Sequence, residues 1–384
     1  MVLDENVLIK LMEWFEKNNY SGPDPYTLRG TKLNSLFIQS ITISRYWDHL
    51  LSILDTQILP LLGLNILPNQ SATSLGLLAQ TYFLLYENTK NKDYLRKGEK
   101  LLRQLIRSKS AGYSGACWGL PFDWKIPYNE KKYIVARKGT PFPTIMTYIM
   151  DAFILGYRYL KKTEYLETFL STENFFLNDL HFKEINGTLC TSYSPVDRHY
   201  VNNASSYVVA GLCRLYQYSK SKKILEMIKK LVNYLILQQK NDGSWTYSSI
   251  DNTRDCLHQC YILQNLLFAN KVLEDCVLEE SLKKGLKVFE SFKSNNGLFM
   301  RLLGEQYFQL IDQAEAVSLY LDLNLKNNAN QLLKSIEKNL YYEKPPFFVT
   351  IVINDKKIKC PYPRWGLSQI AYALAKFINK DNII

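Results

Sequence analysis

Apolar residues recur at spacings of three and four along most of this chain, which is the period of an amphipathic helix. The pattern predicts an all-α fold. The expected helices are Asp4–Asn18, Ser35–Asp55, Ala72–Glu87, Tyr94–Arg107, Pro143–Leu160, Glu164–Leu177, Ala204–Tyr218, Lys222–Gln239, Cys256–Ala269, Leu278–Phe292, Gln313–Leu323, Asn327–Asn339 and Leu367–Ile378. One segment differs, because Phe347–Cys360 is a β-branched run that meets an Asn354-Asp355 turn, which predicts a small β-hairpin near the C-terminus.

The segments between these helices alternate in length. Short connections are expected at 88–93, 161–163, 219–221 and 324–326, and long ones at 108–142, 178–203, 240–255, 293–312 and 340–366. In antiparallel helix pairs, successive connections lie at opposite ends of the assembly. The long loops should therefore all gather at one end.

The first helices of the pairs begin near residues 72, 143, 204, 256, 313 and 367, and the later starts are about 55 residues apart. This weak repeat of a helical hairpin predicts six inner helices ringed by six outer ones, a closed (α/α)6 toroid. We expect a single domain over residues 1–384, in which residues 1–34 form an extra N-terminal helix and a turn-rich extension. The N-termini of the inner helices would surround a cavity at the long-loop end, where their partial positive charge suits anionic ligands.

Composition narrows the class of partner. The 384 residues carry a formal net charge of +11 and no Pro/Gly/Ser-rich linker. A diffuse basic surface favours an acidic polysaccharide, a phosphorylated carrier, nucleic acid or peripheral contact with a lipid surface. Specific nucleic-acid binding is not expected, since no groove-reading motif occurs. A secretory signal and a transmembrane segment are also not expected, and seven scattered cysteines indicate reduced thiols, so we predict a cytoplasmic protein.

The stretch Ser114–Trp124 is the least helical part of the chain, since it holds two glycines and a proline. It places Asp123 between aromatic residues, including Trp118 and Trp124, where a carboxyl group is a candidate for a shifted pKa. These aromatic side chains either line a pocket or plug the end of the helical bundle while Asp123 caps a turn.

Other long loops carry similar chemistry. His199 lies beside Asp197 and could act as a general base held by a carboxylate, or could belong to a surface turn. His258 falls in the first turn of an inner helix, where it is either a base or a satisfied core histidine. The catalytic candidates are Asp123, Asp197, His199, His258 and Tyr193. The substrate-binding candidates are Trp118, Trp124, Arg137, Asn202, Asn203, Asp255, Tyr362, Arg364 and Trp365.

We predict that at least three members of one set line a single pocket at the long-loop end. The set is Asp123, Asp197, His199, His258 and Arg364.

No cofactor or metal is predicted. Cys256, His258 and Cys260 are spaced by two, so neighbouring members of the set point to different faces of a helix, unlike a structural zinc site. The chain also lacks a G-x-S-x-G elbow, a P-loop and a dinucleotide fingerprint.

Gln239, Gly243 and Trp245 resemble the Gln-x-x-x-Gly-x-Trp repeat of the terpenoid-cyclase toroids. The resemblance implies a structural role, with Trp245 buried against the Lys222–Gln239 helix. The Asp-x-Asp-Asp run of squalene-hopene cyclases is absent.

Three further groups of residues resemble bacterial α/α-toroid proteins that are linked to polysaccharide biosynthesis and labelled prenyltransferase-like. The resemblance spans residues 65–378. The groups are Cys117–Trp124 with Thr140–Pro143, Tyr193–Asp197 with Asn202–Ala204, and Asp242–Trp245 with His258. Uronyl C5-epimerases and several polysaccharide lyases have similar toroids, which implies tyrosine, histidine and arginine around a carboxylated sugar.

The leading hypothesis is a carbohydrate-active protein that binds an anionic glycan in the long-loop cavity and acts in polysaccharide biosynthesis or processing. In a lyase or epimerase, Arg137 or Arg364 would neutralise the carboxylate, and Tyr193, His199 or His258 would remove the C5 proton.

In a hydrolase, Asp123 and Asp197 would form the carboxylate pair. The alternatives to an enzyme of this class are a non-catalytic glycan- or partner-binding toroid and an isoprenoid enzyme.

Overall fold

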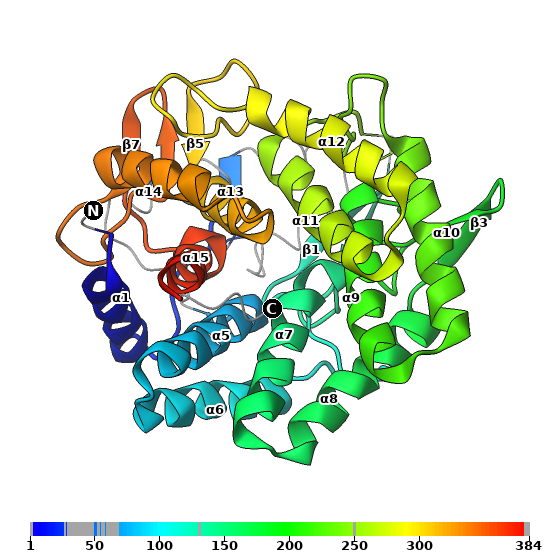
Figure 1. Ribbon diagram of the computed structural model, residues 1–384, viewed down its shortest axis with the longest axis horizontal. Coiled ribbons are helices and arrows are strands. Elements are labelled where there is room, and N and C mark those ends of the chain that lie inside the picture. The colour runs from blue at the N-terminus through cyan, green and yellow to red at the C-terminus, as the bar shows by residue number, and fades with distance from the viewer. Residues whose placement is uncertain are drawn as a thin grey trace.

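A computed structural model describes residues 3–26, 28, 50–51, 54, 58, 69–129, 132–248 and 251–379. The predicted helix Ser35–Asp55 lies almost entirely outside these residues, as does part of the turn-rich segment before it. The described helices form a closed ring of inner helices surrounded by outer ones (Figure 1). None of these helices combines the length and the apolar character needed to cross a bilayer.

Within the described residues, the inner ring contains six helices. Each contacts the next in chain order, and the last contacts the first, which closes the ring. The inner helices are α5 (Ala72–Thr89), α7 (Pro143–Leu160), α9 (Asn202–Ser219), α11 (Cys256–Leu273), α13 (Leu310–Asp322) and α15 (Ser368–Ile378). The predicted (α/α)6 toroid is therefore confirmed.

Five outer helices each pack on the inner helix that precedes them. They are α6 (Lys92–Arg107), α8 (Thr163–Asn174), α10 (Lys222–Gln238), α12 (Cys276–Ser291) and α14 (Lys326–Leu340). The sixth outer position is taken by α1 (Glu5–Lys17), which contacts α15 and closes the outer layer (Figure 1). The N-terminal helix is thus the twelfth helix of the toroid and not an extra one.

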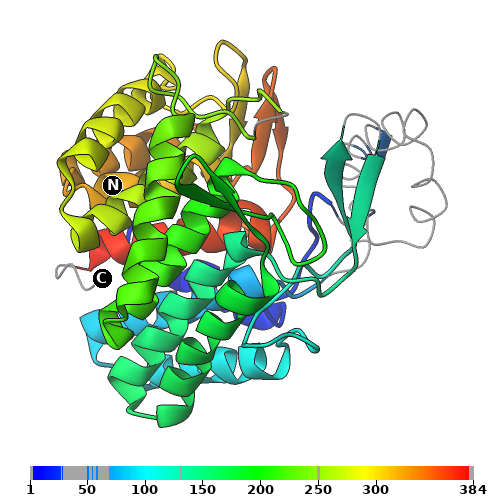
Figure 2. The same ribbon diagram turned by 90° about the vertical axis from the view of Figure 1, so that its right-hand side faces the viewer.

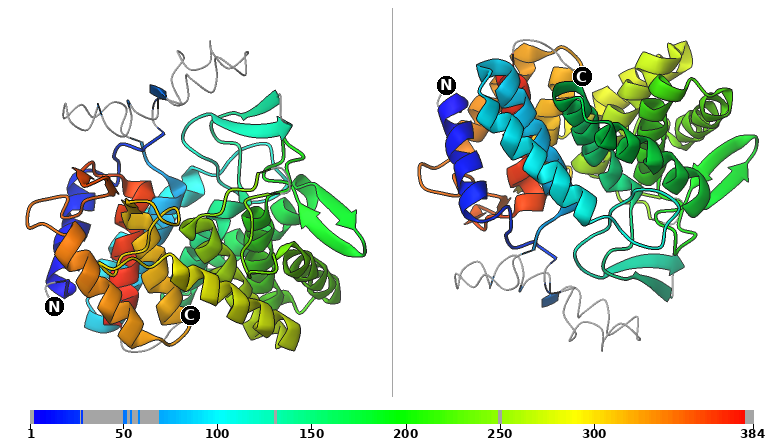
Figure 3. Two further views of the ribbon diagram at one scale, coloured as in Figure 1. Left: turned by 90° about the horizontal axis from the view of Figure 1, so that it is seen from above. Right: turned by 90° about the horizontal axis from the view of Figure 1, so that it is seen from below.

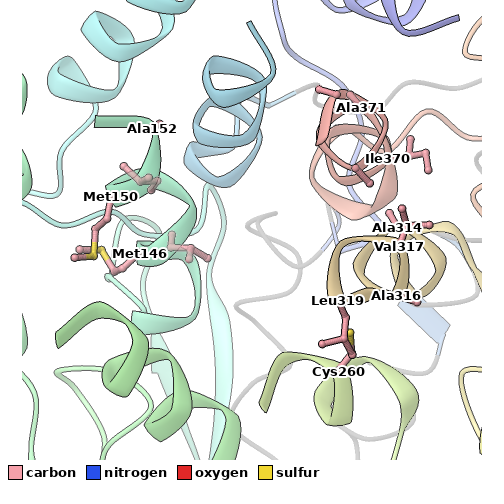
Figure 4. Close-up of a cluster of buried hydrophobic side chains, with 14 of the residues drawn as sticks. Met146, Met150, Ala152, Cys260, Ala314, Ala316, Val317, Leu319, Ile370 and Ala371 are labelled. Atoms are coloured by element: carbon pink, nitrogen blue, oxygen red, sulfur yellow. The ribbon is translucent and has the colours of Figure 1, made fainter. Parts of the chain in front are cut away.

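The two layers differ in how much of each helix is buried. Helix α5 buries every residue from Thr73 to Leu85, whereas α6 buries only Gly98, Leu101, Leu102 and Leu105 on one face. Inner helices can be apolar all round because they have neighbours on both sides, while outer helices keep a polar face toward water. Figure 4 shows part of the inner packing, where Leu319 of α13 is directed toward Cys260 of α11.

Four of the short connections repeat the same turn. Lys90, Lys161, Lys220 and Glu274 follow α5, α7, α9 and α11, and each adopts a left-handed conformation with φ between 51° and 56°. In each, the backbone N–H donates to the carbonyl four residues earlier, which ends the inner helix. The internal repeat is therefore visible in backbone geometry, although these residues are not glycine.

The strands lie in the long loops. The predicted hairpin is confirmed as β6 (Ile351–Ile353) and β7 (Lys356–Ile358), with positive φ at Asn354 and Asp355, and β5 (Tyr307–Gln309) adds a third strand. Two further hairpins were not predicted. They are β1 (Trp124–Asn129) with β2 (Lys132–Ala136), and β3 (Phe182–Ile185) with β4 (Thr188–Thr191).

These strands mark one end of the ring. The β1–β2 hairpin and the β5–β7 sheet project from the same side of the helices in Figure 2, and Figure 3 shows the β1–β2 hairpin standing clear of the ring. Two π-helical turns, η3 (Phe175–Asp179) and η4 (Pro363–Leu367), complete the described elements. The long loops therefore gather at one end, as predicted.

Trp245 has the structural position that the sequence predicts. It is 3% exposed, and its indole N–H donates to the Leu235 carbonyl of α10 at 2.8 Å. Gln239 donates to the carbonyls of Gly243 and Ser281, each at 2.9 Å. The motif thus fastens the end of an outer helix to the turn that follows it.

Candidate active site

A cavity of about 380 Å³ opens at the long-loop end of the toroid. Residues from the first turn of every inner helix line it, because the inner helices all begin at this end. These residues are Thr73, Thr144, Asn203, His258, Ile311 and Gln369. The ring of helix N-termini predicted from the loop lengths is therefore confirmed, and it encloses a cavity of ligand size.

His258 and Asp255 form a hydrogen-bonded pair in the wall of this cavity. Asp255 is the N-cap of α11, where its Oδ1 accepts the backbone N–H of His258 at 3.0 Å. Its Oδ2 lies 2.5 Å from His258 Nδ1. Burial opposes ionisation of Asp255, but the charges of His258 and Arg301 outweigh it and hold the pKa of this carboxyl well below its usual range. An ionised Asp255 fixes the proton on Nδ1 and leaves Nε2 of His258 as a base.

Arg301 carries positive charge beside this pair. Its guanidinium lies 3.6 Å from Asp255 and 2.8 Å from Asp312, and only 12% of its side chain is exposed. Burial raises the pKa of the Asp312 carboxyl to about 6, although the charge of Arg301 opposes the rise. Arg301 is therefore fixed between two buried carboxyl groups.

Arg364 reaches the cavity from the C-terminal long loop. Its Nε and Nη2 bond both oxygens of Asp24 at 2.5 and 2.8 Å, which ties the N-terminal segment to η4. The guanidinium also lies over the rings of Tyr26 and Trp365, at 5.6 and 5.0 Å from their centroids. Trp124 meets Tyr26 edge-on at 5.2 Å, so aromatic side chains form this wall of the cavity.

Tyrosines surround the His258 ring. The Tyr247 ring meets it edge-on at 4.8 Å, and Tyr261, one helical turn later, lies at 6.4 Å. Burial raises the pKa of Tyr193 to about 12 and raises those of Tyr247 and Tyr261 well above the ordinary value. These phenols stay protonated at neutral pH and can donate hydrogen bonds to a ligand.

The floor of the cavity is a polar layer across the toroid axis. Tyr148 lines the cavity, and its hydroxyl lies 2.9 Å from that of Tyr207 and donates to Glu315 Oε1 at 3.1 Å. Glu315 is 4% exposed, and burial raises its pKa to about 7. On the other side of this layer lies a hollow of about 90 Å³ that includes the Asp151–Arg214 ion pair.

The structure brings seven of the sequence-predicted site residues to the cavity and leaves seven outside its lining. Those that line it are Tyr193, His258, Trp124, Asn203, Asp255, Arg364 and Trp365. Those that do not are Asp123, Asp197, His199, Trp118, Arg137, Asn202 and Tyr362. Only His258 and Arg364 line the cavity from the set of five, so the prediction that at least three would is wrong.

Asp197 and His199 belong to a closed turn. Asp197 is 1% exposed and accepts hydrogen bonds from the Ser194 hydroxyl and from the backbone N–H groups of Tyr193 and His199. Burial raises the pKa of Asp197 and lowers that of His199. Asp197 therefore stabilises the loop that carries Tyr193. Asp197 has this structural role instead of holding His199 as a base at the cavity, as was predicted.

Asp123 and Arg137 pair with each other beside the β1–β2 hairpin. Arg137 lies 2.8 Å from Asp123, whose other oxygen accepts the Lys138 N–H at 2.7 Å. The expectation that Asp123 sits in a pocket is thus corrected, because its carboxylate closes the hairpin.

The other three residues outside the lining are buried in the scaffold. Trp118 is 0% exposed, stacks on Phe153 and donates from its indole to the Leu105 carbonyl. Asn202 is fully buried and donates to the Thr246 carbonyl, and Tyr362 is also fully buried. Trp118 therefore repeats the structural role of Trp245 and offers no sugar-stacking surface.

Sequence reasoning missed the other residues of the cavity, among them Tyr26, Tyr247, Asp251, Tyr261 and Arg301. Tyr261 lies three residues after His258 on the same helix face, so helical spacing could have found it. Among the described residues, no group of three or more His, Cys, Asp or Glu side chains is arranged to hold a metal ion.

Comparisons with known proteins bear on the fold. No protein-family model matches the chain, and no curated protein matches it. Among solved structures, a cellobiose 2-epimerase from Bacillus thermoamylovorans is 11% identical, with a TM-score of 0.60 over 80% of this chain and 87% of the other.

Two glycoside hydrolases are also similar. A family 105 enzyme from C. acetobutylicum is 12% identical with a TM-score of 0.59, covering 79% of this chain and 93% of the other. A family 76 α-mannanase from Bacteroides thetaiotaomicron is 14% identical with a TM-score of 0.55, covering 80% and 85%. The chain thus has the six-hairpin toroid fold that occurs in sugar epimerases and glycoside hydrolases, while its membership of the polysaccharide-biosynthesis group stays a prediction.

Proposed function

We propose that this protein is a carbohydrate-active enzyme that transfers a proton at a sugar carbon, as an epimerase or isomerase. The observation that carries the proposal is the Asp255–His258 pair, which opens into the cavity with Arg301 at its side. A histidine held by a carboxylate is a general base, and neighbouring hydrogen-bond donors stabilise the oxyanion that forms. The fold supports the proposal, since it occurs in a cellobiose 2-epimerase.

Each of these residues has a separate role in such a proton transfer. Nε2 of His258 takes the proton from the carbon next to the carbonyl of an opened sugar. The electron pair of that C–H bond moves to the carbonyl oxygen, giving an enediolate that the protonated phenols of Tyr247 and Tyr261 stabilise by donating hydrogen bonds. Return of a proton to the opposite face of the same carbon, with the electron pair returning from the oxygen, gives an epimer. Return to the neighbouring carbon, with the hydroxyl proton passing from one oxygen of the enediolate to the other, gives an isomer.

A glycosidase mechanism has less support from the same geometry. It needs one protonated carboxyl group and one ionised one on either side of the glycosidic bond. Asp251 and Asp255 are the carboxyl groups that line the cavity within the described residues. Asp255 has a lowered pKa and is bonded to His258, so it is a poor proton donor.

The charges around the cavity favour a neutral sugar at the reacting position. Arg301 is shared between Asp255 and Asp312, and Arg364 is paired through two bonds with Asp24. Neither arginine therefore has its charge free to bind a substrate carboxylate. This argues against the uronic-acid lyase and C5-epimerase versions of the hypothesis at this position.

The polar lining also argues against an isoprenoid enzyme. A cavity for a hydrocarbon chain would be lined by aromatic and aliphatic side chains alone. Here two carboxyl groups, a histidine and two arginines converge with hydroxyl groups. A glycan-binding protein without catalysis remains the competing function, and the following experiment separates the two.

The test is to incubate the protein in D₂O with neutral reducing mono- and disaccharides and follow deuterium uptake at carbon by NMR. We expect uptake together with a new epimer or ketose, and loss of both in His258→Ala and Asp255→Asn. His181→Ala is the matched control, because the His181 ring contacts the Pro195 carbonyl and does not line the cavity. Sugar binding without exchange would establish the binding function instead, and release of new reducing ends would establish hydrolysis.

A further inference from the structure

A second hollow, of about 650 Å³, adjoins the candidate active site. It lies between the start of α5, the loop that follows α6 and the segment 137–140. Leu120 lines both this hollow and the reaction cavity, so the two hollows are neighbours at this side chain. A ligand longer than one sugar can therefore extend from one into the other. We refer to the hollow as the lateral groove.

The lateral groove differs from the reaction cavity in its charge. Lys109, Arg137 and Lys138 line it, and its lining contains no aspartate or glutamate among the described residues. Arg137 shares its charge with Asp123, but Lys109 and Lys138 are exposed and form no ion pair with a described residue. The groove thus holds uncompensated positive charge, whereas both arginines of the reaction cavity are neutralised by carboxylates.

The floor of the groove is a fixed backbone structure. Gly119 and Pro141 form an isolated β-bridge, and the Gly139 N–H donates to the Leu120 carbonyl at 2.9 Å. A Cβ atom on Gly119 would lie 2.3 Å from the Gly139 carbonyl carbon, so only glycine permits this approach. The Ser110 hydroxyl donates to the Gly139 carbonyl at 2.6 Å and joins the loop after α6 to the same floor. The two segments that carry the three cations are therefore held together.

We propose that the lateral groove binds an anionic substituent, a carboxylate, sulfate or phosphate, on the same glycan whose neutral sugar reacts in the cavity. This inference rests on the proposed function and specifies its substrate class: an acidic oligosaccharide with a neutral reacting unit. It reconciles the net charge of +11 with a reaction cavity that carries no free cation. The groove is concave and lies next to the cavity, so it can hold one charged group of a ligand. Its lysines act as point charges and attract any anion.

The test compares neutral cellotetraose with its carboxylated, sulfated and phosphorylated derivatives in binding titrations. We expect the derivative with the preferred anion to bind roughly five to ten times more tightly than the neutral sugar, as two exposed charge contacts allow. The difference should shrink as salt is added, since the lysines are exposed. The ranking of the three derivatives identifies which anion the groove prefers.

The matched variants are Lys109→Ala/Lys138→Ala and, as control, Lys222→Ala/Lys223→Ala on the exposed start of outer helix α10. Both remove two positive charges. The groove variant should lose the preference for the anionic derivative while keeping its affinity for cellotetraose, and the control should keep both. Equal binding of neutral and anionic sugars by the unmodified protein, no binding of either, or equal losses in both variants would overturn the proposal.

Failure of the groove proposal is distinguishable from failure of the proposed function. Deuterium exchange on neutral sugars with no preference for anionic derivatives would refute the groove and leave the enzyme assignment in place. A groove-dependent preference for anionic derivatives without any exchange would refute the enzyme assignment and leave an acidic-glycan-binding protein.

Discussion

Replacing Glu315 by glutamine should remove a large pH dependence from the stability of this protein. Glu315 is 4% exposed at the floor of the cavity and accepts a hydrogen bond from the Tyr148 hydroxyl. Burial raises its pKa from the ordinary 4.5 to about 7, because the loss of hydration outweighs the hydrogen bonds from Tyr148 and Gln264 and the charge of Lys376. The neutral carboxyl group is therefore the form that the fold prefers.

The sign of the effect follows from this preference. Below pH 4.5 the carboxyl is neutral in both the folded and the unfolded chain, and the stabilisation from the raised pKa is fully present. As the pH rises from 4.5 through 7, the unfolded chain ionises first and the folded state loses this stabilisation. A pKa change from 4.5 to about 7 corresponds to roughly 3 kcal/mol of unfolding free energy.

Glutamine has the same shape and still accepts from Tyr148, but it does not ionise. Glu315→Gln should match the unmodified protein at pH 4.5 and exceed it by roughly 3 kcal/mol at pH 8. Urea unfolding followed by tryptophan fluorescence between these pH values measures the difference. Glu290→Gln is the control, because Glu290 also accepts from a tyrosine, Tyr320, but lies at the exposed surface.

The difference between Glu315→Gln and the unmodified protein isolates this one group, since Asp312, whose pKa is also raised, is common to both. A difference that stays flat within about 1 kcal/mol over the whole range would refute the reasoning. It would mean that water or a cation reaches Glu315 and solvates its charge.

Three other substitutions test the scaffold around the site, each by its urea midpoint. Trp245→Ala should lose roughly 3–5 kcal/mol because it empties a core position, and an unchanged midpoint would contradict the structural role of this residue. Gln313→Leu should cost roughly 2–5 kcal/mol, because the Phe299 N–H and carbonyl both lose their buried partner, whereas a loss below 1 kcal/mol would show that water replaces it. Arg364→Leu should cost roughly 3–5 kcal/mol by leaving Asp24 buried without its cation, and recovery of that loss in the double variant Arg364→Leu/Asp24→Leu would confirm the cause.

Much of the fold could be predicted because its signals are local. Helical spacing is read within a few turns, and the alternation of loop lengths sets which ends of the helices meet. The place of α1 could not be predicted in this way, since it depends on contact between Glu5–Lys17 and Ser368–Ile378 at opposite ends of the chain. The β3–β4 hairpin, by contrast, has an Asn186-Gly187 turn, a recognised hairpin signal that went unused.

The position of the cavity was predicted, but only part of its lining was. Loop lengths identify the end at which the cavity lies, but they do not say which residues of a loop face inward. Asp197 and His199 are residue types that form catalytic pairs. Only the tertiary structure shows that Asp197 instead accepts hydrogen bonds within its own turn. Tyr193, four residues earlier, is the member of that loop that reaches the cavity.

The register of the internal repeat explains which loop residues reach the cavity. Trp245 and Phe299 occupy equivalent positions, and the backbone N–H of each donates to the side chain of a glutamine fourteen residues later, Gln259 and Gln313. Each aromatic follows an Asx-Gly pair, Asp242-Gly243 or Asn296-Gly297, whose glycine has positive φ. The same hydrogen bond, from a loop backbone N–H to a glutamine side chain, therefore connects two successive long loops to the first turns of α11 and α13.

This hydrogen bond fixes the position of two polar side chains in each repeat, relative to the aromatic residue and the glutamine. Two residues after the aromatic come Tyr247 and Arg301, and one residue before the glutamine come His258 and Asp312. Tyr247, Arg301 and His258 line the cavity. Asp312 does not line it but forms an ion pair with Arg301. The scaffold thus determines where a side chain faces the cavity, and the residue types at those two repeat positions determine which polar groups the cavity receives. Aligning the two loops on their Asx-Gly-x-aromatic segments would have identified Arg301 from sequence, since it stands where Tyr247 stands one repeat earlier.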